Sequence, residues 1–109
     1  MNTKDIGKQL ENLVVVYFQE IDPKTRLSKA SGALSDVADI VTRDFYIEVK
    51  KRGSESLTIE KKVWRHLCNQ IPTGSLKIPL LIMQNKDKDT FVILQINDFI
   101  RILKNKERS

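Results

Sequence analysis

Apolar side chains recur at helical spacing in the first twenty residues of the chain. The repeating positions are Ile6, Leu10, Leu13, Val14 and Tyr17. This period predicts an amphipathic helix from Lys4 to about Glu20, which Asn2 or Thr3 can cap. The segment Asp22-Pro23-Lys24 ends this helix, because a proline biases the residue before it towards an extended conformation.

The next part of the chain predicts three strands. A short strand is expected around Thr25 to Ser28, and two longer strands are expected from Val37 to Val41 and from Phe45 to Lys51, of which the last alternates apolar and polar residues. The polar residues Thr42-Arg43-Asp44 between the two longer segments predict a turn, so these segments are expected to pair as a hairpin.

A second helical period follows a polar loop. Ile59, Val63, Leu67 and Ile71 repeat every four residues. This spacing predicts a helix with Ser56 or Thr58 as its cap, and Pro72 with Gly74 ends it.

The last third of the chain predicts two strands and a closing helix. The strands are the apolar run from Ile78 to Met83 and the segment from Phe91 to Ile96. Asn97 is expected to cap a short helix, and the basic tail after it is expected to fray. The apolar stripe of that helix consists of Phe99, Ile102 and Leu103.

The order of these elements predicts an α/β fold in which helices flank a central mixed sheet of about five strands. The segment Leu80 to Met83 is apolar at every position, so it is expected in the middle of the sheet with both faces covered. Residues 1–109 contain no linker or internal repeat, and the length suits one domain with one core.

Composition narrows the class of protein. Hydrophobic residues make up 40% and charged residues 30% of the chain, as in ordinary globular domains. The single Cys68 excludes an internal disulfide and a cysteine zinc site, and the apolar runs are too short to cross a bilayer. With no signal peptide at the start, a cytoplasmic location is expected. The formal charge of +5 favours a polyanionic partner.

The predicted hairpin brings acidic and basic side chains together at one edge of the sheet. Glu48 and Lys50 share one face of the second strand because alternate side chains face the same way, and the turn brings Asp39 close to Glu48. Two close carboxylates repel, and a hard cation such as Mg²⁺, for which Mn²⁺ can substitute, relieves that repulsion. The carbonyl of Val49 can add a ligand, and Lys50 can hold a water or stabilise charge on a phosphate.

The spacing from Asp39 to Glu48-Val49-Lys50 resembles the motif of the PD-(D/E)XK nuclease superfamily. Gly7-Lys8-Gln9-Leu10-Glu11 is similar to the glycine-to-glutamate element of its archaeal and phage Holliday-junction resolvases. Ser31-Gly32-Ala33, the helix bearing Trp64 and the closing Asn97-Asp98-Phe99 extend the resemblance over nearly the whole chain. The resemblance implies a restriction-endonuclease-like sandwich, and it makes Glu11 a further acidic residue at the metal.

One choice of ligand stays open in this pattern. Ala38 stands where the family usually has proline or glycine, so Asp36 competes with Asp39 as the metal ligand. Both cannot face the same way in a regular strand. The spacing to Glu48 and the apolar residues after Asp39 favour Asp39.

Basic residues around the predicted site are candidates for phosphate contacts, which would read shape rather than base sequence. The expected DNA-binding residues are Arg26, Lys29, Ser31, Lys51, Arg52, Lys61 and Lys62. His66 is expected on the surface of the second helix, and Cys68 is expected to be a small buried residue.

The favoured function is a metal-dependent endodeoxyribonuclease, most specifically a phage-type resolvase of branched DNA in recombination and repair. The resemblance, and the need for two sites to cut two strands symmetrically, imply a homodimer. Two alternatives remain: a general nicking or repair nuclease, and a noncatalytic DNA-binding module on the same fold.

Overall fold

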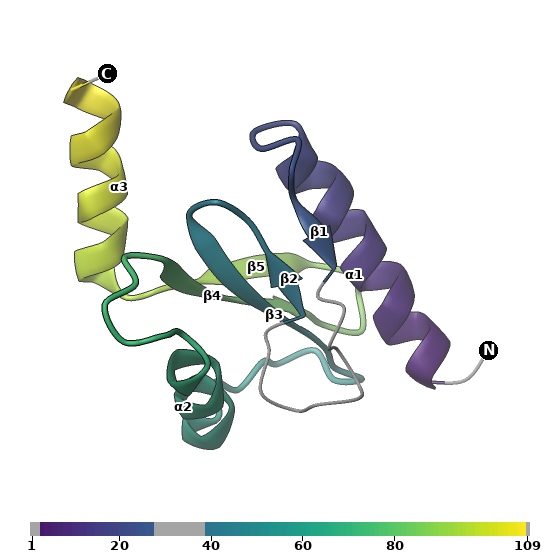
Figure 1. Cartoon of the computed structure of the whole chain (residues 1–109). Coiled ribbons are helices and arrows are strands. Elements are labelled where there is room, and N and C mark those ends of the chain that lie inside the picture. Colours follow the sequence, from purple (N-terminus) through teal and green to yellow (C-terminus); the bar gives the residue numbers. More distant parts are fainter. Residues whose placement is uncertain (1–2, 28–38, 109) are drawn as a thin grey trace.

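A computed structural model describes residues 3–27 and 39–108 of the chain (Figure 1). The described residues form three helices and five strands in an α/β arrangement. In chain order these are α1 (Thr3–Gln19), β1 (Arg26–Leu27), β2 (Ile40–Val41), β3 (Phe45–Lys51), α2 (Lys61–Asn69), β4 (Ile78–Gln84), β5 (Thr90–Ile93) and α3 (Ile96–Arg108).

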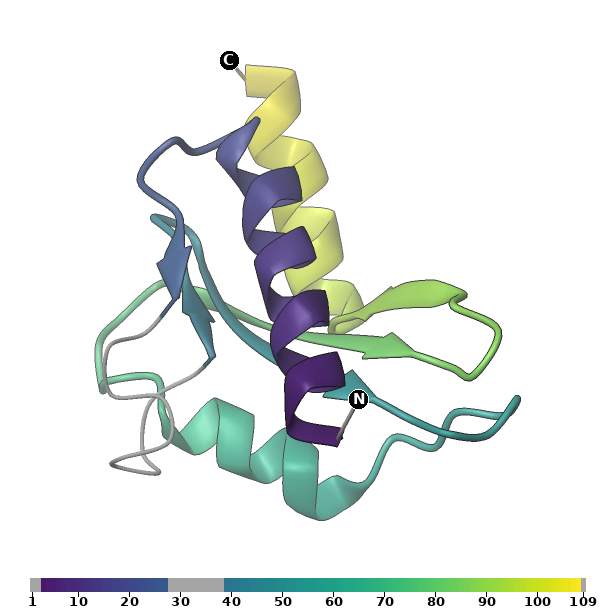
Figure 2. The same cartoon turned by 90° about the vertical axis from the view of Figure 1, so that its right-hand side faces the viewer.

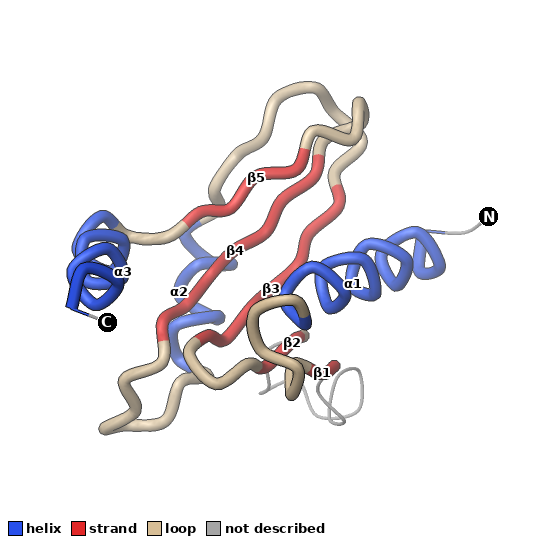
Figure 3. Tube along the Cα trace, turned by 90° about the horizontal axis from the view of Figure 1, so that it is seen from above, coloured by secondary structure: helices blue, strands red, loops and turns tan. Residues whose placement is uncertain are grey.

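The strands form one mixed sheet in the order β1-β2-β3-β4-β5, which Figure 3 shows from above. Strands β3 and β4 run parallel, and the other neighbours are antiparallel. The hairpin of β2 and β3 confirms the prediction from the alternating pattern. Its turn is held by the hydroxyl of Thr42, which accepts hydrogen bonds from the backbone N–H groups of Asp44 at 3.1 Å and Phe45 at 2.9 Å.

Strand β4 is buried on both faces, as its uniformly apolar sequence predicts. Leu80 and Ile82 belong to the first core, on one face of the sheet, and Leu81 and Met83 belong to the second core, on the other face. Strand β4 is an interior strand, between β3 and β5, but the central strand of the order β1-β2-β3-β4-β5 is β3.

The helices lie on both faces of the sheet. Figures 1 and 2 show α1 and α3 on one face and α2 on the opposite face. Helix α1 buries Leu10 and Val14 in the first core, where Phe18 meets Phe45 edge-on with ring centroids 5.9 Å apart. Helix α2 buries Leu67 completely in the second core.

The start of α2 corrects the sequence prediction. The residue before the helix is Glu60, in an extended conformation and without a side-chain cap hydrogen bond, so neither Ser56 nor Thr58 caps it. Ile59 precedes the helix and Ile71 follows it. Tertiary packing of Leu67 therefore defines this helix more than its end signals do.

The closing helix α3 also differs from the prediction. It begins at Ile96, so Asn97 lies inside it, and the carbonyl of Gln95 accepts the backbone N–H of Phe99 at 3.1 Å. Strand β5 accordingly ends at Ile93 rather than Ile96. The basic tail continues the helix to Arg108, because lysine and arginine are good helix formers and cations are favourable near a helix C-terminus.

Candidate active site

Asp39 is fixed against β3 by a backbone hydrogen bond. Its Oδ2 accepts the N–H of Val49 at 3.0 Å. Asp39 directly precedes β2, and the pairing of Ile40 with Ile47 places it beside the second half of β3. The hairpin therefore brings Asp39 next to Glu48, as the sequence predicts.

Glu48 and Lys50 lie on the same face of β3, and they form an ion pair. Lys50 Nζ is 3.4 Å from Glu48 Oε1. Glu48 is only 8% exposed, because it pairs in register with the fully buried Leu81 of β4. A carboxylate this deeply placed is costly to ionise without a partner. Lys50 supplies one such partner.

Glu11 approaches the same site from α1. Burial raises the pKa of its half-buried carboxyl, and the charges of Asp39 and Glu48 raise it further. Lys8 and Lys50 act in the opposite direction and lower this pKa. Three carboxyl groups from α1, the residue before β2, and β3 thus share one electrostatic environment.

The other two carboxyl groups also hold their protons more tightly than usual. Burial raises the pKa of Glu48, and the neighbouring charge of Asp39 adds to that rise. Burial raises the pKa of Asp39, although the Val49 N–H and the charge of Lys50 oppose it. Clustered carboxyls with raised pKa values are typical of functional sites.

His66 is a neighbour of this site that the sequence pattern did not reveal. Its imidazole is exposed on α2, as expected, but its charge lowers the pKa of both Asp39 and Glu48. The helical period gave a signal for this position, because His66 directly precedes the core residue Leu67. Leu67 packs against Leu81, and Leu81 is the register partner of Glu48. That link requires the parallel pairing of β3 with β4.

Carboxylate oxygens are the ligands that a hard cation such as Mg²⁺ prefers, although the carboxylates of this site do not surround one position. Among the residues the structure describes, no three His, Cys, Asp or Glu side chains gather as a metal-binding group. Mg²⁺ is commonly held by one or two carboxylates, with water and substrate phosphates completing its shell. Asp39 and Glu48 suit that mode, and the roles of Glu11 and the Val49 carbonyl as ligands stay predictions.

The predicted DNA-binding residues differ in whether their side chains already contact other residues of the protein. Arg52 pairs with Glu60 at 3.5 Å, and Lys51 donates to Gln84 and Asn85. Three others are exposed: Arg26 on the edge strand β1, and Lys61 and Lys62 at the start of α2. Lys29, Ser31 and the competing ligand Asp36 lie outside the described residues.

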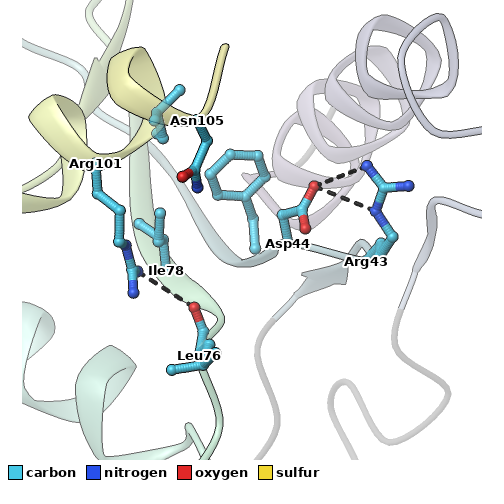
Figure 4. Close-up of a pocket in the computed structure, with 8 residues that line it drawn as sticks. Arg43, Asp44, Leu76, Ile78, Arg101 and Asn105 are labelled. Atoms are coloured by element: carbon cyan, nitrogen blue, oxygen red, sulfur yellow. Dashed lines mark hydrogen bonds and ion pairs between the residues drawn. The ribbon is translucent and has the colours of Figure 1, made fainter. Parts of the chain in front are cut away.

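A hollow of the described surface lies away from these carboxylates. It measures about 450 Å³ and opens where β3 and β4 begin, at Phe45 and Ile78 (Figure 4). Arg43 pairs with Asp44 at 3.2 Å, and Arg101 donates to the carbonyl of Leu76 at 3.2 Å. Both arginines have partners within the protein. The positive charge of the two arginines at this hollow is therefore already balanced by carboxylates of the protein, Asp44 and Asp98.

Comparison of the chain with protein-family models, curated proteins and solved structures finds no match in any of the three. Among the described helices, none combines the length and apolar character needed to cross a membrane.

Proposed function

We propose that the protein is a metal-dependent DNA endonuclease of the PD-(D/E)XK superfamily, with a restriction-endonuclease-like sandwich fold. One observation carries the proposal: the Val49 N–H holds Asp39 beside Glu48, and Lys50 lies 3.4 Å from Glu48. The residues with the motif's spacing thus meet at one end of β3. The mixed five-stranded sheet with helices on both faces agrees with the same class.

Each residue of the site has a distinct role in the proposal. Asp39 and Glu48 hold Mg²⁺ or Mn²⁺, with the Val49 carbonyl and Glu11 as further oxygen donors. A cation held by these residues would supply Lewis-acid chemistry, which polarises a phosphodiester and lowers the pKa of a bound water. Lys50 orients the attacking water and stabilises negative charge on the phosphate, because its ammonium is held at the site by Glu48.

The preferred substrate in the proposal is branched DNA, and above all a four-way junction. The net charge of +5 and the exposed Arg26, Lys61 and Lys62 support contact with a phosphate backbone. The proposed activity would serve recombination and repair, in a phage or its host.

Symmetric cutting of a junction requires two sites, so the proposal includes a homodimer. Helix α3 supports it by leaving large apolar side chains open to contact. The exposed fractions are 73% for Ile96, 46% for Phe99, 41% for Ile100 and 41% for Leu103. Exposed apolar groups that gather on one element often mark a protein interface.

A noncatalytic DNA-binding module is the second candidate, and one observation favours it. The described residues gather no closed set of three metal ligands, and Lys50 already neutralises Glu48. In that case the carboxylates would only position Lys50 towards a phosphate. A general nicking or repair nuclease is the third candidate, and it would share the same site chemistry.

A substrate panel separates these candidates. The purified protein is incubated with end-labelled four-way junction, linear duplex and single strands, with and without Mg²⁺. Glu48→Ala and Lys50→Ala test the site. Lys24→Ala is the control. Lys24 is exposed in the turn after α1 and donates its N–H to Asp22. Asp22 also accepts the N–H of Arg43, which lies in the turn before β3, away from the end of the strand that carries Glu48 and Lys50.

The proposal predicts paired, symmetric cuts in the junction that need Mg²⁺ and are lost in both site variants but not in the control. Equal cutting of duplex indicates a general nuclease. Junction binding without cutting under any of these conditions contradicts the enzyme and favours the binding module.

A further inference from the structure

A second hollow lies on the α1 face of the sheet, at the end of β3 that carries the candidate active site. It measures about 360 Å³. Its lining comes from α1, the ends of β3 and β4, and the turn before β5, and consists of Gln9, Leu10, Leu13, Lys51, Gln84 and Lys88. Lys51 directly follows Lys50, and successive side chains of a strand point to opposite faces. The end of β3 therefore presents one ammonium to each face of the sheet.

The ammonium of Lys51 is held in place by neutral groups. Its Nζ donates to Gln84 Oε1 at 2.6 Å and to the carbonyl of Asn85 at 3.0 Å. Within the described part of the chain it forms no ion pair with a carboxylate. An ammonium has three N–H donors, so one remains for a ligand. A part-buried cation with only neutral partners favours an anion beside it.

Lys88 adds a second cation at an unusual backbone position. It is exposed, and its φ of 68° lies in the left-handed region. The turn from Asn85 to Asp89 requires this conformation, which glycine or asparagine adopts more easily than lysine. A lysine in this position costs backbone energy that a glycine would not, and it places an ammonium at the hollow. Like Lys51, it forms no ion pair among the residues described.

The hollow at Arg43 and Arg101 provides the contrast. There each guanidinium already has a carboxylate partner, Asp44 for Arg43 and Asp98 for Arg101. Within residues 3–27 and 39–108, the cations around the second hollow have no such partner, although the cavities are of comparable size. Charge rather than volume therefore distinguishes the second hollow as an anion site.

We propose that this hollow binds a backbone phosphate of the DNA strand, next to the phosphate at Glu48 and Lys50. The inference rests on the proposed function. The strand passes over the end of β3, with Lys50 contacting one phosphate and Lys51 with Lys88 contacting a neighbouring one. Gln9 of α1 donates a further hydrogen bond. Contacts of this kind fix the position of the strand without reading its sequence.

The test measures binding rather than cutting. Affinity for a labelled four-way junction is measured in EDTA across a series of salt concentrations. Lys88→Gly removes the charge while suiting the positive φ, so it should keep or raise the melting temperature. Lys51→Gln removes the other charge, and Lys24→Ala is the matched loss of one exposed lysine.

Each of the two hollow variants should weaken binding several-fold and reduce the slope of log affinity against log salt by about 0.7 to 0.9, as the loss of one phosphate contact does. Lys24→Ala should change neither. If Lys88→Gly and Lys51→Gln bind like the control, or if the wild-type protein binds no DNA, the inference is wrong. Cleavage assayed in parallel separates the two proposals. If the wild type cuts DNA but Lys88→Gly and Lys51→Gln bind like Lys24→Ala, only this inference is overturned. If the wild type binds DNA through these lysines but does not cut it, only the catalytic proposal is overturned.

Discussion

Val49 donates its backbone N–H to Asp39 Oδ2 at 3.0 Å, and this bond joins the residue before β2 to the centre of β3. It places a carboxylate beside the nearly buried Glu48, the residue that precedes Val49. The geometry of the candidate site depends on this contact, because β2 itself has only two residues, Ile40 and Val41, to hold the pairing.

Removing the charge of Glu48 should stabilise the metal-free protein at neutral pH. Burial raises the pKa of Glu48 above its ordinary value of 4.5. When the pH rises above 4.5, this carboxyl loses its proton in the unfolded chain before it does so in the folded protein. The folded protein therefore binds more protons than the unfolded chain, and the free energy of unfolding falls until the pH exceeds the raised pKa. Glu48→Gln should therefore melt a few degrees above the wild type at pH 7 to 8.

The difference between Glu48→Gln and the wild type should vanish below pH 4, where the carboxyl is protonated in both states. Thermal melting in EDTA across this pH range measures it. Adding Mg²⁺ should raise the melting temperature of the wild type more than that of the variant, because a ligand stabilises the state that binds it. A Glu48→Gln protein that melts lower than the wild type at pH 8 contradicts this account.

His66 should tune the acidity of the site without being a ligand. Its charge lowers the pKa of Asp39 and Glu48. His66→Ala should raise both pKa values, and His66→Arg should lower them, because arginine keeps its charge at every accessible pH. Carboxyl titration by NMR checks the two variants against each other. Identical titration curves in both would show that His66 does not act on the site.

Leu67→Ala should destabilise the fold by about 2–5 kcal/mol, since it removes a completely buried side chain from the second core. Denaturant unfolding measures this loss. Leu103→Ala is the control, because Leu103 is 41% exposed and should cost much less in the monomer. Equal losses in the two variants would mean that α2 does not depend on Leu67 for its packing.

Asp39→Asn and Asp36→Asn distinguish the two possible ligands. Asp39 approaches Glu48, whereas Asp36 lies outside the described residues. Asp39→Asn should reduce cleavage by about 100-fold or more, and Asp36→Asn should leave most of the activity. Metal-dependent cleavage of a labelled junction is the measurement. The reverse order of effects would assign the ligand to Asp36.

The local pattern of the sequence predicts much of this architecture. Alternation from Phe45 to Lys51 and the polar turn before it give the hairpin, and that hairpin alone brings Asp39 to Glu48. The uniformly apolar β4 gives a strand buried on both faces. These features depend on neighbours in sequence, so local periodicity is sufficient to find them.

Features that depend on distant contacts were missed or misplaced. The position of His66 near the carboxylates follows from the parallel pairing of β3 with β4, which no local pattern encodes. The start of α2 after Glu60 overrides the usual capping residues. Helix α3 is longer than its signals suggest, and only Ile102 of its apolar stripe packs on the core described here.

The most direct test of the central claim is cleavage by Glu48→Gln beside the wild type. The substitution keeps the size and shape of the side chain, and it is expected to leave a fold that is more stable. With labelled four-way junction and Mg²⁺, the wild type should cut, and Glu48→Gln should be at least about 100-fold slower while still folded and bound to DNA. Wild-type rates in Glu48→Gln, or no cutting by the wild type with Mg²⁺ or Mn²⁺, would contradict the account.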